Sequence, residues 1–379
     1  MNNNKKQIKR IGIDARFYGP GKGLGRYTKE VVDRILDMDT KNEYVIFLGL
    51  DSFDIFNTKN PKVKKVLVRA RWYSVLEQIM MPYLILREKL DFMHFLHFNV
   101  PLICPTKYIV TIHDLILTKF PTPRASTLSP IFYKIKHLGY KMIIKSGIKN
   151  AQKVIAVSCF TKQEIINQFS ISNDKIVVTY EGVSNDLMKL KAGDKSMSLG
   201  YNIRVPFLLY VGNAYPHKNL GGLVNIFSKI RKKYPDLSLV LVGKEDYFYK
   251  RLKTYVKDRD FTNIIFTGYV SDQDLAKIYS KALAYIFSSF CEGFGLPPLE
   301  AMNHGVPVLS SNKTCMPEIL EDAALYFNPD KESDAIQKII EIMENKDLRE
   351  KLKIKGFAQV KKYSWDKCAR QTFEIYVRE

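Results

Sequence analysis

SSFCEGFGLPPLEAMNHGVPVLS (288–310) carries the clearest sign of how this chain folds. The apolar run ALAYIF (282–287) precedes it and is typical of a buried strand. Pro297-Pro298 lies where a helix should begin, and proline is tolerated there because its missing N–H would have had no intrahelical partner. Open α/β sheets bind ligands beyond the carboxyl ends of their strands. We therefore expect an anion site at the backbone of the turn residues Gly293, Phe294, Gly295 and Leu296.

Two carboxylates bracket this turn. Glu292 precedes it and Glu300 lies inside the predicted helix, so that they can reach opposite ends of one extended ligand. A diphosphate that joins a nucleoside to a sugar fits this description. An ordinary strand–turn–helix unit with incidental acids is the alternative.

The string EGFGLPPLEAMNHGVPV (292–308) resembles the E-x7-E signature of the retaining family-4 glycosyltransferases of the GT-B fold. Asn303-His304 departs from that pattern, in which a small residue often precedes the glycine. The resemblance implies an α/β protein with two Rossmann-like domains that face an interdomain cleft. It also implies that Glu300 holds the ribose hydroxyls of a nucleotide-sugar donor and that Glu292 contacts the donor hexose as a catalytic residue. Neither a metal nor another cofactor is expected.

A second stretch supplies a cation for such a reaction. PFLLYVG (206–212) is a predicted buried strand, and the residues after it resemble the family's VG-x(4)-RKN-L segment. Lys218 matches the lysine that neutralises the leaving diphosphate, and Gly212 and Asn213 begin this donor-binding segment. Asn213 and His217 stand where many relatives have arginine, so the sequence assigns no second phosphate cation. A solvated surface lysine is the alternative reading of Lys218.

The nucleotide base is expected near residues 270–272. In guanine-nucleotide members of the family, backbone near Val270 and an acid near Asp272 contact the base, which hints at GDP. Charge complementarity at a helix N-terminus explains Asp272 equally well. Ser271 and Asp274 form a predicted capping box at the same helix start.

A glycine loop follows the predicted first strand, IGIDARF (11–17). Its Gly21, Gly23 and Gly25 lack the G-x-G-x-x-G spacing of dinucleotide-binding proteins. The resemblance instead implies that Gly23 and Gly25 face the donor sugar and diphosphate. A tight strand–helix turn without a ligand is the alternative. Apolar residues recur at helical spacing after the loop, at Tyr27, Val31, Ile35 and Met38.

Three histidines lie on or near strands of the first half. The predicted strand KYIVTIHDLI (107–116) contains His113, which the resemblance identifies as a catalytic residue that contacts the donor sugar or its phosphate. A loop-capping histidine is the alternative. His94 and His97 should point to opposite faces of one strand, which disfavours a metal pair. We expect one of them to pack in the core, and His97 with Asn99 to line the acceptor site.

At 379 residues the chain is long enough for two domains. A hydrophobic share of 46% is typical of soluble globular proteins, and no apolar run reaches the roughly 18 residues that span a bilayer. No signal-peptide core follows the basic N-terminus, so we expect a cytoplasmic protein. The five scattered cysteines favour neither zinc nor disulfides.

The predicted divisions are an acceptor-side domain (1–190), a linker (191–205), a nucleotide-sugar domain (206–362) and a C-terminal helix (363–379) that returns to the first domain.

The net charge of +20 is concentrated in the first half. Residues 1–190 hold 30 Lys and Arg against 16 Asp and Glu, a net of +14, and no acid lies between Asp114 and Glu164. The predicted helix 130–151 carries a basic stripe and an apolar face, which suggests peripheral contact with anionic membrane lipid at the inner face of the membrane. A solvated helix face is the alternative. The stripe is Lys134, Lys141, Lys145 and Lys149, and the apolar face is Ile131, Ile135, Leu138 and Met142.

The resemblance, together with these patterns, implies a retaining, metal-independent hexosyltransferase that uses a glycan or a lipid-linked acceptor. Asp37-Met38-Asp39 and Asp258-Arg259-Asp260 spell a D-x-D metal motif but do not end strands. GDP-mannose is the first-choice donor, because IDAR, TIHD, PHKNL and EGFGLPPLEAM look most like bacterial mannosyltransferases of the family. UDP-hexoses are the alternative donors, and a nucleotide-sugar epimerase, a phosphorylase and a nucleic-acid-binding protein are the alternative classes. Nucleic acid alone would not explain the paired glutamates.

Overall fold

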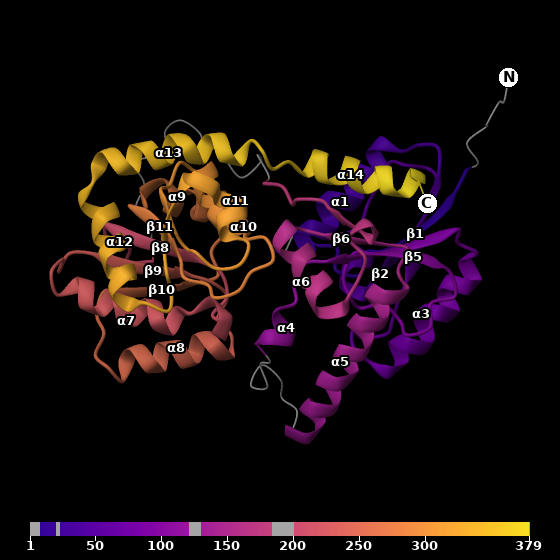
Figure 1. The fold of residues 1–379 in the computed structure, drawn as a ribbon, viewed down its shortest axis with the longest axis horizontal. Helices are drawn as coiled ribbons and strands as arrows, with labels where there is room; N and C mark the ends of the chain where they lie inside the picture. The colour runs from indigo at the N-terminus through magenta and orange to yellow at the C-terminus, as the bar shows by residue number, and fades with distance from the viewer. Residues whose placement is uncertain (1–7, 20–22, 121–129, 184–200, 379) are drawn as a thin grey trace. The chain divides into compact units, whose positions relative to one another are not determined.

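The computed structural model describes residues 8–19, 23–120, 130–183 and 201–378, with the backbone alone for 130–135. Gly21, linker residues 191–200 and the side chains of Ile131, Lys134 and Ile135 lie outside this description. The chain divides into two compact units. The first lies within Met1–Leu115, Leu128–Gly182 and Trp365–Glu379, and the second within Ile116–Thr127 and Val183–Ser364 (Figure 1).

The first unit is built on a parallel sheet of seven described strands in the order β3-β2-β1-β4-β5-β6-β7. Alternate residues of β1, such as Ile11 and Ile13, are buried together with their neighbours, because helices cover both faces of such a sheet. The strands are β1 (Arg10–Asp14), β2 (Glu43–Leu48), β3 (Val63–Leu67), β4 (Phe92–Phe95), β5 (Lys107–Ile112), β6 (Lys153–Ala156) and β7 (Ile176–Val178). The helices are α1 (Leu24–Met38), α2 (Leu50–Phe53), α3 (Val75–Glu88), α5 (Pro130–Asn150), α6 (Cys159–Phe169) and α14 (Trp365–Arg378).

The second unit repeats this arrangement with six described parallel strands, in the order β10-β9-β8-β11-β12-β13. Its strands are β8 (Phe207–Val211), β9 (Ser238–Val242), β10 (Ile264–Gly268), β11 (Ala284–Phe287), β12 (Val308–Ser311) and β13 (Ala324–Phe327). Its helices are α4 (Ile116–Lys119), α7 (Leu220–Arg231), α8 (Tyr247–Lys257), α9 (Asp272–Lys281), α10 (Leu296–Asn303), α11 (Met316–Leu320), α12 (Glu332–Glu344) and α13 (Lys346–Val360). Two parallel α/β sheets confirm the predicted fold class.

Each sheet reverses its strand order once, between β1 and β4 in the first unit and between β8 and β11 in the second. Adjacent loops leave such a point in opposite directions, which opens a crevice at the carboxyl ends of the two strands. The fold therefore directs attention to the loops after β1 and β4 and to those after β8 and β11.

The C-terminal helix α14 packs on α1 of the first unit, as the sequence predicted (Figure 1). The hydroxyl oxygen of Tyr376 lies 2.5 Å from Nδ1 of His94, and the ring of Trp365 meets that of Tyr27 edge-on at 6.0 Å. His94 is the packed histidine that the sequence suggested, because it is fully buried and burial lowers its pKa to about 3.

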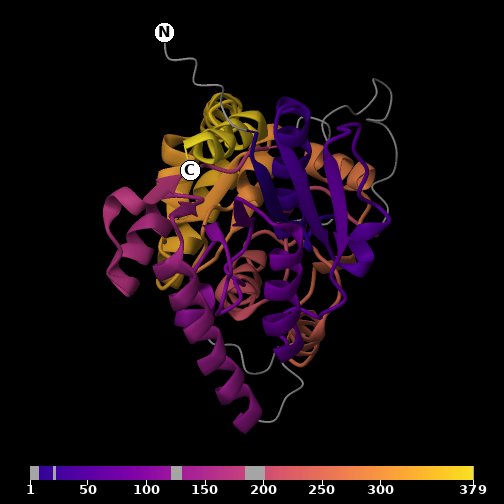
Figure 2. The same ribbon diagram turned by 90° about the vertical axis from the view of Figure 1, so that its right-hand side faces the viewer.

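Two helices differ from their predicted burial. Tyr27, Val31 and Ile35 of α1 are buried, but Met38 is 42% exposed because α1 ends there. In α5, Leu138 and Met142 are exposed, and the core side is formed by Ile144 and Ile148. The first turns of α5 extend beyond the sheet in both views (Figures 1 and 2). No helix among the described residues is long and apolar enough to cross a membrane.

Candidate active site

Lys218 and Glu292 meet at the reversal point of the second sheet. Lys218 ends a short 3-10 turn (Pro216–Lys218) after β8, and Glu292 lies in the loop between β11 and α10. The lysine Nζ lies 2.6 Å from the Glu292 carboxylate, and the two side chains are only 14% and 9% exposed. The same Nζ lies 5.5 Å from the centre of the Phe287 ring. Sequence analysis predicted both residues, and the structure pairs them 74 positions apart.

Backbone contacts hold the two loops together. The Ser288 hydroxyl donates to the carbonyl of Lys218 at 2.9 Å, and the N–H of Phe290 donates to the carbonyl of His217 at 2.7 Å. The Cys315 thiol donates to the carbonyls of Glu292 and Phe294. The position of the Lys218–Glu292 pair is therefore set by the fold.

Gly295 gives the turn before α10 its shape. Its φ of +92° is in the left-handed region that favours glycine, and an added Cβ would lie 2.3 Å from Cε of Met316. Helix α10 begins at Leu296, and the prolines at 297 and 298 have no N–H to donate. The predicted anion site therefore rests on the backbone of Gly293 to Leu296, where the sequence placed it, and anion binding there stays a prediction. Glu300, on α10, is buried like Glu292.

His217 precedes Lys218 but does not replace the missing arginine. Burial, together with the neighbouring Lys218 charge, lowers the pKa of His217 to about 4. Its ring stacks on that of Tyr215, and its Nδ1 is buried without a hydrogen-bond partner. His217 is therefore neutral at neutral pH and can offer a ligand a hydrogen bond. Asn213, which is exposed, and Gly212 form the loop that leaves β8.

The predicted base-binding residues lie two strands away from β8. Val270 is buried and follows β10, the edge strand of its sheet. Asp272 begins α9 and is exposed, and the Ser271 hydroxyl accepts the N–H of Asp274 at 3.2 Å as the helix cap. The predicted cap is confirmed, and contact with a base stays a prediction.

His113 follows β5 directly and carries a carboxylate partner that sequence analysis missed. Its Nδ1 lies 3.1 Å from Oε1 of Glu181, and its Nε2 lies 3.0 Å from the carbonyl of Leu96. Both partners only accept hydrogen bonds, so both ring nitrogens donate and the imidazolium form is favoured. Burial lowers the pKa of His113, but the hydrogen bond and charge of Glu181 outweigh burial and raise that pKa above its ordinary value.

Replacing Glu181 with glutamine should therefore lower the pKa of His113, because the negative charge that stabilises the imidazolium is lost. With a raised folded-state pKa, the wild-type pair stabilises the fold fully below the unfolded pKa of about 6.5, and this stabilisation disappears as pH rises through the folded pKa. An NMR titration of the imidazole ring measures the shift. An unaltered His113 titration in the Glu181→Gln protein would refute this account, with Glu43→Gln as a surface control.

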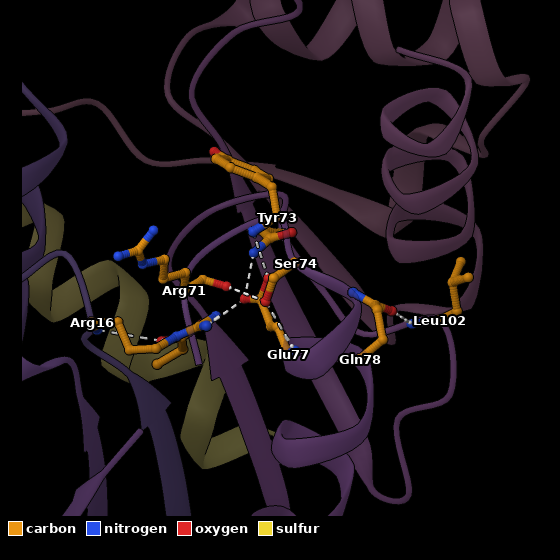
Figure 3. Close-up of polar contacts among 9 residues, drawn as sticks. Arg16, Arg71, Tyr73, Ser74, Glu77, Gln78 and Leu102 are labelled. Atoms are coloured by element: carbon orange, nitrogen blue, oxygen red, sulfur yellow. Dashed lines mark hydrogen bonds and ion pairs between the residues drawn. The ribbon is translucent and has the colours of Figure 1, made fainter. Parts of the chain in front are cut away.

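A buried ion-pair network lies at the carboxyl end of β1 (Figure 3). Arg16 donates to both carboxylate oxygens of Asp14, at 2.7 and 2.6 Å, and contacts Glu77 through its other terminal nitrogen. Glu77 also accepts the backbone N–H of Tyr73 at 2.7 Å and the Asn99 amide at 2.6 Å. This network joins β1, the start of α3 and the loop after β4. Arg16 ends the IDAR string, which resembles the mannosyltransferases, but no role was predicted for Arg16 or for Glu77 from the sequence.

The predicted acceptor residues border this network. His97 packs its ring against Phe98, at 3.9 Å between centres, and against Phe17, at 5.0 Å. The Phe17 ring also contacts the partly exposed Trp72. Nδ1 of His97 and Oδ1 of Asn99 are buried without hydrogen-bond partners. Buried polar atoms without a partner are rare in folded proteins, so a bound water or ligand hydroxyl is the expected partner of these two.

The structure places the described part of the glycine loop between β1 and α1. Gly23 has a φ of +68° and precedes the first residue of α1, and Gly25 lies in its first turn. An added Cβ at Gly25 would lie 3.3 Å from the carbonyl of Phe17, whereas one at Gly23 would meet open space. Gly23 is therefore needed for its backbone conformation.

Comparison with known proteins assigns both units. Residues 22–187 match the family described as glycosyltransferase family 4, and residues 197–359 match the one described as glycosyl transferases group 1. The O-antigen chain mannosyltransferase B of Escherichia coli is 29% identical over 386 residues, which cover 94% of this chain and 96% of that protein.

Two solved structures show the same fold across the chain. Sucrose-phosphate synthase of Thermosynechococcus elongatus has a TM-score of 0.76 at 17% identity, with 98% of each chain covered. HepE of Anabaena, solved in complex with UDP-glucose, has a TM-score of 0.73 at 16% identity, with 98% of this chain and 100% of that chain covered. The chain therefore belongs to the family-4 glycosyltransferases of the GT-B fold.

Proposed function

We propose that the protein transfers a hexose, with retention of configuration, from a nucleotide sugar to a glycan or lipid-linked acceptor without a metal ion. The observation that carries this proposal is the buried Lys218–Glu292 pair at the reversal point of the second sheet, beside the N-terminus of α10. A cation and a helix N-terminus that converge on one space suit a diphosphate. The second glutamate, Glu300, gives the same site a place for ribose hydroxyls.

Each residue of the site would contact a different part of the donor. Lys218 would turn from Glu292 towards the donor diphosphate, which leaves the Glu292 carboxylate to accept hydrogen bonds from the hexose hydroxyls. As the bond from the anomeric carbon to the phosphate oxygen breaks, Lys218 stabilises the charge on the leaving group. The acceptor oxygen bonds to the anomeric carbon on the same face, and its proton passes to the departing phosphate oxygen. His113, held as an imidazolium by Glu181, is the proposed catalytic residue of the first unit, where its positive charge suits contact with the donor sugar or its phosphate.

The acceptor would bind the first unit at His97 and Asn99. The unpartnered Nδ1 of His97 can donate a hydrogen bond to a sugar hydroxyl or accept one from it, depending on its tautomer, and the unpartnered Oδ1 of Asn99 can accept one. The exposed part of Trp72 supplies an aromatic face. The protein would act in the cytoplasm at the inner face of the membrane. The exposed Lys141, Lys145 and Lys149 of α5 support contact with anionic lipid there.

GDP-mannose is the proposed donor and UDP-hexoses are the second candidates. The Escherichia coli mannosyltransferase and the exposed Asp272 at the start of α9 favour GDP-mannose, whereas the Anabaena complex with UDP-glucose shows that this fold also holds UDP-sugars.

Saturating GDP-mannose should raise the melting temperature of the protein on the order of 5 °C, because a ligand at a hundred times its Kd stabilises by about 2.7 kcal/mol. A thermal-shift panel with GDP-mannose, GDP-glucose, UDP-glucose and UDP-galactose makes the comparison. Stabilisation by UDP-sugars alone would reject mannose from GDP as the donor, and no stabilisation by any of them would reject the proposed function.

A further inference from the structure

Helix α3 is apolar on two opposite faces, and one of them is open. Its buried face includes Met81, Leu84 and Ile85, which belong to the core beneath the sheet. On the other side, four large side chains follow one another at intervals of four, four and three, and each is 61% to 81% exposed. They are Val75, Ile79, Tyr83 and Leu86. A helix that is hydrophobic all round is normally buried, so this face indicates a binding partner.

The loop after β4 extends this open face. The backbone N–H of Leu102 donates to the side chain of Gln78 on α3 at 2.9 Å, which ties the loop to the helix (Figure 3). Leu102 and Ile103 are both exposed, and so is Leu76 at the start of α3. We call these seven residues, Val75, Leu76, Ile79, Tyr83, Leu86, Leu102 and Ile103, the α3 ridge.

In the segment that contains α3, residues 69–89, the exposed charged residues are all basic, and the exposed acid Asp91 follows this segment. The four exposed bases are Arg69, Arg71, Arg87 and Lys89. The two acids of this segment, Glu77 and Glu88, are buried, and basic side chains pair with both. Figure 3 shows the Arg71 side chain extending away from Glu77. The chain has buried each acid of this segment and left each base in reach of solvent.

We propose that the α3 ridge docks the protein onto a bilayer that contains anionic phospholipid. Apolar side chains on one helix face, flanked by cations, suit insertion between lipid headgroups, and each nearby base adds attraction to an anionic surface. A second copy of the chain is a poorer occupant, because a two-fold contact would bring the same four cations of each copy together. This inference deepens the membrane contact proposed above and moves its main surface from α5 to α3.

Vesicle sedimentation tests the α3 ridge. Vesicles of phosphatidylcholine with one third phosphatidylglycerol should bind the wild-type protein, and pure phosphatidylcholine vesicles should bind it more weakly. The Ile79→Ser/Leu86→Ser variant should lower the partition coefficient at least about tenfold, because two side chains would lose their burial in the membrane. Arg71→Glu/Lys89→Glu should weaken binding to the anionic vesicles and leave binding to the neutral ones unchanged.

Two matched variants locate the surface. Tyr269→Ser/Ile354→Ser removes two equally exposed apolar side chains from the second unit and should bind vesicles like the wild type. Leu138→Ser/Met142→Ser removes two exposed apolar side chains from α5. A larger loss of vesicle binding in this variant than in the Ile79→Ser/Leu86→Ser variant would overturn the proposal. The proposal would also be overturned if the Ile79→Ser/Leu86→Ser variant bound vesicles like the wild type. The same holds if the wild-type protein were a dimer in solution and this variant a monomer.

Donor binding separates this proposal from the proposed function. The thermal shift given by the donor sugar nucleotide should be the same in the wild type and in the α3 variants, since the α3 ridge and Lys218 lie in different units. Loss of vesicle binding with the donor shift intact supports the α3 ridge. If vesicle binding depends on the α3 ridge but no sugar nucleotide shifts the melting temperature, the docking proposal stands and the proposed glycosyl transfer is rejected.

Discussion

Replacing Lys218 with alanine should lower kcat/KM for hexosyl transfer about 100-fold or more. In the proposed reaction Lys218 is the cation that meets the leaving diphosphate, and removal of one preorganised group that stabilises developing charge typically has an effect of this size. The neighbouring His217 cannot compensate, since it is neutral at neutral pH. Steady-state kinetics with the donor found by the thermal-shift panel would measure the loss.

Lys229→Ala is the matched control for this experiment. Lys229 lies on α7 in the same unit, and its side chain is 58% exposed in a surface pair with Glu332. Its loss should leave kcat/KM within about twofold, because a surface ion pair contributes little.

A double variant tests whether Lys218 and Glu292 act together. Lys218→Ala/Glu292→Ala should lower kcat/KM by much less than the product of the two single effects, since paired residues act as a unit. Wild-type turnover in both Lys218→Ala and Glu292→Ala would refute the assignment of this site.

Replacing Glu77 with alanine should destabilise the first unit by about 3 kcal/mol, because removal of one partner leaves a buried charge on Arg16 uncompensated. The amide of Asn99 and the backbone N–H of Tyr73 would also lose an acceptor. Both tryptophans of the chain, Trp72 and Trp365, lie in the first unit. Tryptophan fluorescence during urea titration therefore reports the unfolding of this unit alone.

Asp366→Ala provides the comparison for that titration. Asp366 pairs with Arg34, but its side chain is 75% exposed, so its loss should change the free energy of unfolding by less than about 1 kcal/mol. A Glu77→Ala effect no larger than that of Asp366→Ala would mean that the buried network does not stabilise the first unit.

The sequence predicted the fold because its strands are continuous apolar runs that parallel sheets with two covered faces require. PFLLYVG (206–212) became β8 within one residue at each end, and the Pro297-Pro298 pair marked the start of α10. Lys218 and Glu292 could be found because each lies in a recognisable local motif beside a strand. Their direct pairing could not be predicted, since it depends on how two loops cross at the reversal point of the sheet.

The parts that sequence analysis missed depend on contacts between distant segments. Nothing near His113 in the sequence points to Glu181, which comes 68 residues later and meets it only because β5, β6 and β7 are adjacent. Helical spacing on α3 and α5 likewise shows which residues share a face, but not which face the sheet covers. Leu138 and Met142 were expected to form the apolar side of α5 and lie in solvent, while the open side of α3 was not noticed at all.

The position of α14 bears on how the chain folds during synthesis. The helix completes the first unit, yet residues 183–364 of the second unit are made before it. At about 5–20 residues per second, the ribosome leaves the first unit without its last helix for on the order of ten seconds or more. During that interval His94 lacks Tyr376 and the ring of Tyr27 lacks Trp365. The nascent first unit therefore exposes the face of α1 that α14 later covers, and its packing is complete only after the second unit has been translated.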